Sequence, residues 1–223
     1  MSDVLNNALR KMLPEARVQA TSLPGVPDVQ LWLIDPEPVD RPFGPEEIAA
    51  ISYHTPYWAF CWGSGLALAR YILQEPSLVA GKRVIDFGAG SGVVAVACAM
   101  AGADVIACDI DEASQLACKA NAELNGVKYQ VSGDLLAMEL NNADLLIAAD
   151  VLYDRGNLPW LDVFLQYAPE VWVADSRVKN FSHDHYALTD QMQAHTVPDM
   201  GEPYEFSHIR FYRSCDKPVK MFA

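Results

Sequence analysis

A glycine-rich turn is the stretch of the chain whose residues are best suited to chemistry. Residues 86–92 read Asp-Phe-Gly-Ala-Gly-Ser-Gly. The first two of these residues are also the last two of the apolar run RVIDF. A dinucleotide-binding turn would have glycine or alanine at position 93, where this chain has Val93. A carboxylate at position 86 repels a pyrophosphate but attracts an amine or a sulfonium. The turn therefore favours S-adenosylmethionine, unless its glycines only permit a tight turn with positive φ.

Two more carboxylates follow the next two predicted strands. Asp109 ends the run VIACD, 21 residues after Gly88, where an acidic residue can accept the hydroxyls of a ribose. A helix N-cap is the alternative for Asp109, although Asp111 can fill that position equally well. Asp134 can accept from the amine of an adenine, or it can simply make a turn. The predicted cofactor-binding residues are Trp62, Asp86, Gly88, Gly90, Gly92, Asp109 and Asp134.

Asp150 and Tyr153 are the predicted catalytic residues. Asp150 ends the run ADLLIAAD, so it should stand beside the glycine turn, and Tyr153 follows three residues later. Methyl transfer is an in-line displacement, which the protein promotes mainly by positioning the reacting groups. A lysine acceptor must first lose a proton, which costs roughly 4 to 5 kcal/mol at pH 7. A nearby carboxylate guides the amine in but also favours its charged form. Capping of the following helix is the alternative role for Asp150.

Five aromatic residues precede a predicted helix: Tyr53, Tyr57, Trp58, Phe60 and Trp62. Aromatic faces attract sulfonium and ammonium groups by cation–π interaction. Clustered aromatic residues more often pack in a core, which we expect for most of these five. Trp62 leads directly into Gly63-Ser64-Gly65, and we assign it to the cofactor wall.

These residues need a scaffold, and the chain from Tyr57 onward alternates between strand and helix patterns. Short apolar runs separated by helices of ten to fifteen residues predict an α/β fold with a parallel sheet, in which ligands bind at the carboxyl ends of the strands. A helix is expected from residue 63 until Pro76 stops it. A further helix is expected in NLPWLDVFLQYA and a strand in VKYQVSG. The run HDHYALTDQMQA is expected to be a final helix, and YEFSHIRFYR a terminal strand.

Two regions of the chain differ in their proline content. Residues 1–57 contain eight of the fourteen prolines and one strand candidate, VQLWLI. Proline at this density disrupts helices and ladders, so we expect a small, loosely structured N-terminal extension. Residues 58–223 are expected to form the catalytic domain.

Composition limits the partners. The net charge is −13, with no run of Lys or Arg, which argues against nucleic acid and anionic membranes. The five cysteines show no CxxC pairing, so we expect buried free thiols in a cytoplasmic protein. No apolar run reaches the roughly 18 residues of a spanning helix. The five histidines have no metal-ligand spacing, and no metal is predicted. The oligomeric state is left open.

The turn DFGAGSG, the strand end CDID and the run ADVLYD resemble the seven-strand S-adenosylmethionine-dependent methyltransferases. PYWAFCWGSGLALARYIL and the D-x-x-Y motif at 150–153 are similar to a family of protein-lysine methyltransferases, and most of all to its members acting on the electron-transfer flavoprotein β subunit. The resemblance implies a Rossmann-like sheet of seven strands with helices on both faces and the last strand antiparallel. It implies lysine engagement by Asp150 and Tyr153, S-adenosylhomocysteine as product, and that β subunit as a candidate protein partner.

The chain differs from this family in one turn, and the difference concerns the methyl acceptor. Relatives tend to carry a Gly-Asp-Pro turn after the fifth strand, whereas this chain reads VWVADSRVKNF. Methylation of a small molecule such as nicotinamide, and a nucleotide-binding module without catalysis, stay open as alternatives. A nicotinamide-dinucleotide dehydrogenase is disfavoured by Asp86 and Val93.

Overall fold

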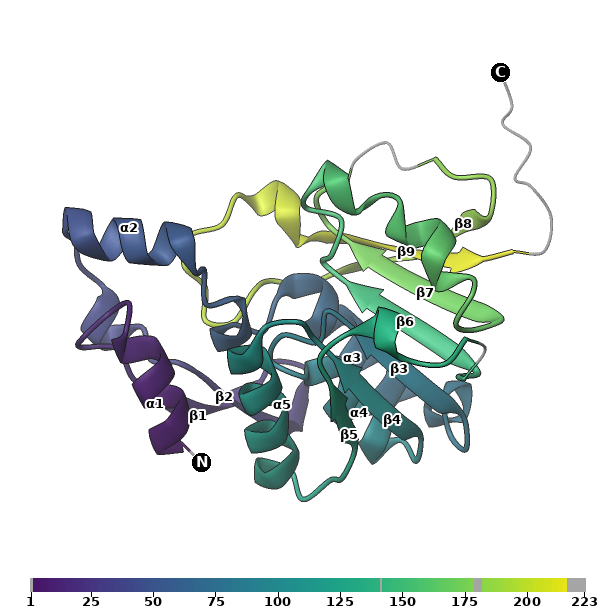
Figure 1. The fold of residues 1–223 in the computed structure, drawn as a ribbon, viewed down its shortest axis with the longest axis horizontal. Helices are drawn as coiled ribbons and strands as arrows, with labels where there is room; N and C mark the ends of the chain where they lie inside the picture. The colour runs from purple at the N-terminus through teal and green to yellow at the C-terminus, as the bar shows by residue number, and fades with distance from the viewer. Residues whose placement is uncertain (1, 141, 179–181, 216–223) are drawn as a thin grey trace.

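A mixed β-sheet organises the molecule. The computed structural model describes residues 2–140, 142–178 and 182–215, and within them a seven-stranded sheet has the order β5-β4-β3-β6-β7-β9-β8 (Figure 1). The strands are β3 (Arg83–Phe87), β4 (Asp104–Cys108), β5 (Gln130–Ser132), β6 (Leu145–Ala149), β7 (Glu170–Asp175), β8 (Tyr186–Gln193) and β9 (His208–Ser214). The first five are parallel, and β9 runs antiparallel to both β7 and β8. The predicted α/β class and the antiparallel last strand are confirmed.

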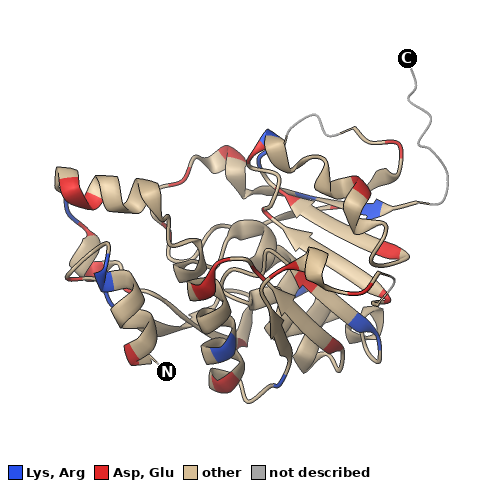
Figure 2. Ribbon diagram, in the orientation of Figure 1, with Lys and Arg blue, Asp and Glu red and all other residues tan. Residues whose placement is uncertain are grey.

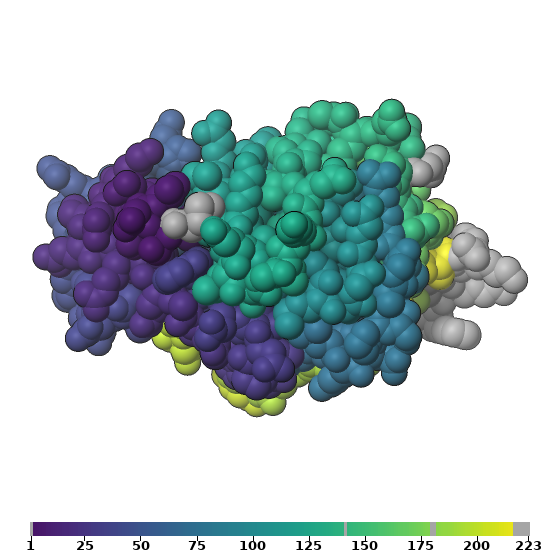
Figure 3. All heavy atoms as spheres, turned by 90° about the horizontal axis from the view of Figure 1, so that it is seen from below, coloured from purple at the N-terminus to yellow at the C-terminus, as the bar shows by residue number. Residues whose placement is uncertain are grey.

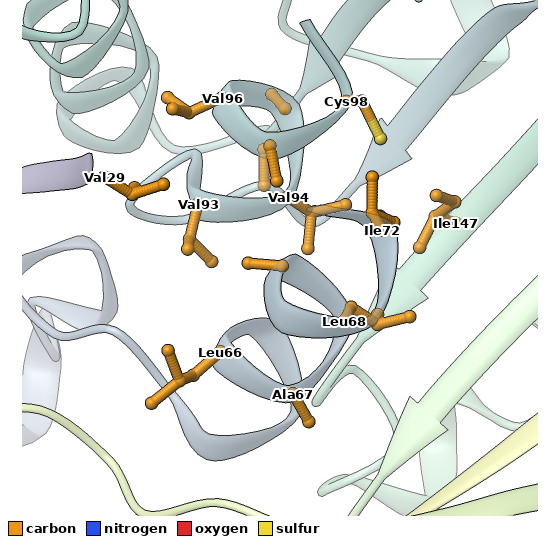
Figure 4. Close-up of a cluster of buried hydrophobic side chains, with 14 of the residues drawn as sticks. Val29, Leu66, Ala67, Leu68, Ile72, Val93, Val94, Val96, Cys98 and Ile147 are labelled. Atoms are coloured by element: carbon orange, nitrogen blue, oxygen red, sulfur yellow. The ribbon is translucent and has the colours of Figure 1, made fainter. Parts of the chain in front are cut away.

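Both faces of the sheet are covered. In β6, Leu145 and Ile147 pack into one buried cluster, while Leu146 and Ala148 pack into another on the opposite face. This is why the strand reads as a continuous apolar run. The helices of the main body are α3 (Gly63–Gln74), α4 (Val93–Met100), α5 (Glu112–Leu124) and α6 (Trp160–Phe164). Helices α3 and α4 cover the first face with small and branched side chains (Figure 4), and α6 lies on the second. No helix among the described residues is long and apolar enough to cross a membrane.

The first 57 residues are more ordered than their prolines predict. They form α1 (Ser2–Arg10), an antiparallel hairpin of β1 (Val18–Leu23) and β2 (Val26–Ile34), and α2 (Pro45–Tyr53). The hairpin is joined to α5 by the Trp32 amide, which donates to Asn121 Oδ1 at 2.7 Å. Figure 3 shows the N-terminal residues packed against the body of the molecule. Pro24 lies in the hairpin turn, where its missing N–H costs no hydrogen bond between the strands. Because these residues form regular helices and strands, the expectation of a loosely structured extension was wrong.

Three elements differ from their predicted form. The run HDHYALTDQMQA was expected to be a helix, but it supplies the edge strand β8. Its middle is exposed and polar, so it lacks the alternation by which a half-buried strand is recognised. Tyr186 anchors it, since its hydroxyl donates to the Leu161 carbonyl at 2.7 Å. The predicted helix in NLPWLDVFLQYA is limited to α6, and the strand in VKYQVSG to β5.

Candidate active site

A cavity of about 640 Å³ opens among the loops that follow the parallel strands. This is where an α/β sheet binds its ligands, because the strand order reverses between β3 and β6. Seven of the nine predicted site residues line the cavity: Trp62, Gly88, Gly90, Asp109, Asp134, Asp150 and Tyr153. The sheet thus brings together residues that lie up to 91 positions apart in the sequence.

The glycine turn presents bare backbone to the cavity. Gly88 and Gly90 have φ angles of 67° and 53°, which L side chains rarely adopt. A Cβ on Gly88 would lie 2.9 Å from Val151 Cγ1, so a side chain there would displace its neighbour. The Gly90 N–H donates to Asp109 Oδ2 at 2.8 Å. Asp109 therefore holds the turn in the shape that leaves the cavity open.

Asp86 and Gly92 lie behind the turn and do not line the cavity. Asp86 is buried, and its Oδ2 accepts from the Ala95 N–H at 3.0 Å, inside the first turn of α4. Burial raises the pKa of Asp86 to about 7. Gly92 precedes α4 with a φ of 76°, and a Cβ there would meet Tyr129 Oη at 3.0 Å. The geometry gives both residues a part in supporting the turn, while their contact with a ligand stays a prediction.

The two acidic residues after β4 have different partners. Asp111 caps α5 by accepting from the Ala113 N–H at 3.0 Å. Asp109 is not the cap: its second oxygen accepts from the Asp111 N–H at 2.9 Å. Burial raises the pKa of Asp109. Asp134 lines the cavity and also makes a turn, with its Oδ1 accepting from the Leu136 N–H at 2.9 Å.

Asp150 is tied to the start of a distant helix. Its Oδ2 accepts from the Ser64 N–H at 2.9 Å, and its Oδ1 accepts from the Ser64 hydroxyl at 2.5 Å and from the Ser176 hydroxyl at 3.3 Å. Asp150 thus caps α3, whose own N-cap residue Trp62 makes no side-chain cap bond. Burial raises the pKa of Asp150 to about 6, and the neighbouring Asp175 carboxylate adds to the rise. A carboxylate has about four acceptor positions, so three donors leave room for one more.

Aromatic rings form the rim of the cavity. Tyr153 is 54% exposed, and its ring lies 5.6 Å from that of Tyr57. The Trp62 indole N–H donates to the Tyr57 carbonyl at 2.9 Å. The expectation of core packing holds for Trp58, which is buried, but not for Tyr53 and Tyr57, which are exposed. Deeper in the wall, the Trp160 ring packs 5.0 Å from Phe87.

Negative charge dominates the cavity wall. Four carboxylates line it: Asp109, Asp111, Asp134 and Asp150. Figure 2 shows acidic segments gathered around the loops that follow the parallel strands. Arg177 is the one basic residue among the described residues of the wall, and it pairs with Glu202 at 2.5 Å. Its guanidinium also lies 4.1 Å from the centre of the Phe206 ring. The cavity is therefore suited to a cationic ligand and not to a phosphate.

Several residues of the site were missed in the sequence. Ser64 is fully buried against Asp150, and a lone serine in WGSGLAL gives no sign of that partner. Trp160 and Asn157 come from the segment after the D-x-x-Y motif and were assigned only to a helix. Tyr57 was weighed as a core residue. Tyr57 and Trp160 lie close in sequence to recognised motifs, and this was the one sign that they belong to the site.

Comparison with known proteins agrees with this geometry. Residues 68–154 match the family model of the ribosomal protein L11 methyltransferase (PrmA). The electron transfer flavoprotein beta subunit lysine methyltransferase of Rattus norvegicus is 32% identical over 182 residues, covering 78% of this chain and 70% of that protein. The Danio rerio enzyme of the same name is 36% identical over 203 residues, covering 86% and 74%. The chain belongs to the electron transfer flavoprotein beta subunit lysine methyltransferase family. It is an S-adenosylmethionine-dependent protein-lysine methyltransferase.

Solved structures agree on the fold. The magnesium protoporphyrin IX methyltransferase of Synechocystis, determined with bound SAH, has a TM-score of 0.52 and 15% identity, covering 68% of this chain and 83% of that one. The residues of the present cavity fit the cofactor of such a methyltransferase. The glycine turn leaves space for a close approach, and the carboxylates suit an amine, a sulfonium and ribose hydroxyls.

Proposed function

We propose that this enzyme methylates lysine side chains of the electron transfer flavoprotein β subunit of its own organism. The observation that carries the proposal is a single cavity with two chemically different ends. One end combines the glycine turn with Asp109 and Asp134, and the other combines Asp150 with the tyrosines of the rim. The relatives at 32% and 36% identity bear the name of this substrate.

The first end would hold the cofactor. Gly88 and Gly90 would allow its close approach, while Asp109 and Asp134 would accept from its ribose and adenine. Trp62 would supply an aromatic face toward the positive charge. When bound, S-adenosylmethionine supplies a methyl group on a positively charged sulfur. The chain's own part at this end is to orient that group toward the second end of the cavity.

The second end would receive the lysine. We propose that Asp150 draws the ammonium into the cavity and orients the nitrogen, using the acceptor position that Ser64 and Ser176 leave free. Tyr57 and Tyr153 would enclose the aliphatic stem of the lysine and exclude water. Removal of water lowers the pKa of an amine, which opposes the effect of the carboxylate. The lysine nitrogen, once it has lost its proton, would accept the methyl group that S-adenosylmethionine supplies, with S-adenosylhomocysteine as the leaving group.

Transfer to a purified substrate tests the proposal. The parent enzyme is incubated with labelled S-adenosylmethionine and the recombinant β subunit of the source organism, and the labelled residue is located by mass spectrometry. Label on a lysine of the β subunit supports the proposal. Asp150→Ala is expected to lose transfer while retaining cofactor binding, as measured by calorimetry. Label only in a small-molecule acceptor such as nicotinamide would contradict the proposal.

A further inference from the structure

Helix α2 is unlike the other helices of the molecule. Each of the other described α-helices contributes buried side chains, whereas none of the nine residues of α2 is buried. Ile48 is 53% exposed and Tyr53 is 84% exposed. Figure 1 shows α2 standing away from the sheet. Helix α2 therefore leaves two large apolar side chains without a buried contact within the described part of the molecule.

The chain runs directly from α2 into the wall of the cavity. Tyr53 ends the helix, and Tyr57 on the cavity rim comes four residues later. The end of α2 is closed by two local bonds, since the His54 N–H donates to the Ala50 carbonyl and the Thr55 hydroxyl to the Ile51 carbonyl, both at 3.0 Å. Tyr57 and Tyr153 are 43% and 54% exposed. Ile48, Tyr53, Tyr57 and Tyr153 are called the rim surface below.

Charge indicates what the rim surface contacts. Residues 45–65 contain two glutamates and no Lys or Arg. Arg41 pairs with Glu47 at 2.7 Å, which leaves Glu46 as the charge of α2 that is unpaired among the described residues. The cavity behind them carries four carboxylates, and its Arg177 is paired with Glu202. A second copy of this chain would bring a net charge of −13 against this acidic face, which disfavours self-association. A lysine-bearing segment of a protein substrate meets the same face with opposite charge.

We infer that α2 and the rim surface dock the protein substrate, holding apolar and basic residues on either side of the target lysine. This inference rests on the proposed function, because it assumes that a protein lysine enters the cavity. The lysine would pass beside the paired rings of Tyr57 and Tyr153, while the flanking segment packs on Ile48 and Tyr53. Docking outside the cavity raises the local concentration of the lysine without altering the methyl-transfer step.

Kinetics of the double variant Ile48→Ala/Tyr53→Ala test the inference. With the β subunit as substrate, KM is expected to rise about tenfold while kcat changes less than about twofold. With a short lysine peptide that cannot reach α2, the parent and the variant should have the same kcat/KM. Leu188→Ala is the matched control, since Leu188 is 49% exposed on the edge strand β8, and it should leave every constant unchanged.

Each outcome has one meaning. A KM for the protein substrate equal to that of the parent would overturn the docking role of α2. Sedimentation that shows a parent dimer and a monomeric double variant would assign the surface to self-association and would also overturn it. If the parent leaves the β subunit unmethylated, the proposed substrate is wrong, and the same KM comparison is made with the protein that the parent does label in an extract.

Discussion

Asp150 combines an unusual backbone with an unusual set of partners. Its φ of 51° is the one positive value among the described residues other than glycine, and aspartate tolerates this region better than most residues. The turn aims its carboxylate at Ser64, which donates to both oxygens through its N–H and its hydroxyl. Strained residues of this kind concentrate at functional sites. The carboxylate is held in place before any substrate arrives.

Ser64→Ala tests whether this serine sets the protonation of Asp150. The Ser64 hydroxyl bond lowers the pKa of Asp150, which burial raises to about 6. Without that bond the pKa should rise further, because hydrogen bonds to the charged form favour it. The acid limb of the pH profile of kcat/KM is expected to move upward by about one pH unit. Ser176→Ala removes a longer bond of 3.3 Å and should produce a smaller shift. An acid limb that stays in place in Ser64→Ala would assign Ser64 a purely structural role.

Asp109→Asn tests the cofactor end. The variant loses the negative charge that accepts from Gly90 and Asp111, so both the turn and the ribose site should weaken. The Kd for S-adenosylmethionine measured by calorimetry is expected to rise about tenfold or more. Asp104→Asn is the control, since its side chain is 66% exposed at the other end of β4. Parent affinity in Asp109→Asn would remove this residue from the site.

At the scale of elements, helices α3 and α4 meet at a glycine. A Cβ on Gly65 would lie 2.8 Å from Val93 Cγ1, and Figure 4 shows Val93 among the side chains between the two helices. Gly65→Ala is therefore expected to lower the free energy of unfolding by about 1 to 3 kcal/mol through overpacking. Val93→Ala should cost a similar amount by leaving a cavity. In the double variant the alanine Cβ at position 65 occupies the space that valine leaves. The free energy of unfolding measured in urea should therefore fall by less than the sum of the falls in the two single variants. Additive losses would mean that the helices do not meet as described.

Elements whose residues repeat with a clear period were predictable from the sequence. Strand β3, the glycine turn and helix α3 follow local patterns, and the structure places them as expected. Strand β8 was missed because it is an edge strand with few buried residues, and its partner β9 lies about 20 residues away. Strand β9 itself was expected within YEFSHIRFYR, so the missing signal is that of β8 alone. In the N-terminal hairpin the candidate VQLWLI lies in β2 as expected, whereas β1 was missed beside the proline in the turn.

The residues of the site also divide into those that local sequence patterns predict and those that they do not. Gly88, Gly90, Asp109 and Asp150 stand at strand ends and could be predicted, because the carboxyl ends of parallel strands meet. Asp86 also ends a strand, yet its side chain is buried behind the turn against α4. The sequence reports the position of a residue but not the face to which its side chain points. Ser64 depends on a contact 86 residues away, which no local pattern contains.

At the scale of the whole molecule, buried carboxylates link stability to pH. Burial raises the pKa of Asp86 to about 7 and that of Asp150 to about 6, whereas an unfolded aspartate titrates near about 3.9. Between these values the folded chain binds more protons, so its stability falls as pH rises. The free energy of unfolding in urea is expected to be about 4 kcal/mol lower at about pH 8 than at about pH 5. Asp86→Asn should flatten this dependence and Asp104→Asn should not. A parent protein that grows more stable over this range would contradict the assignment.

The central claim is that this cavity methylates a lysine of the flavoprotein β subunit. The most direct measurement is the intact mass of the β subunit isolated from the source organism with and without the gene for this chain. Methyl groups are expected on one or more lysines in the parent strain, and their loss is expected in the deletion strain. Expression of the parent enzyme should restore them, and expression of Asp150→Ala should not. An identical mass of the β subunit in all four strains would contradict the claim.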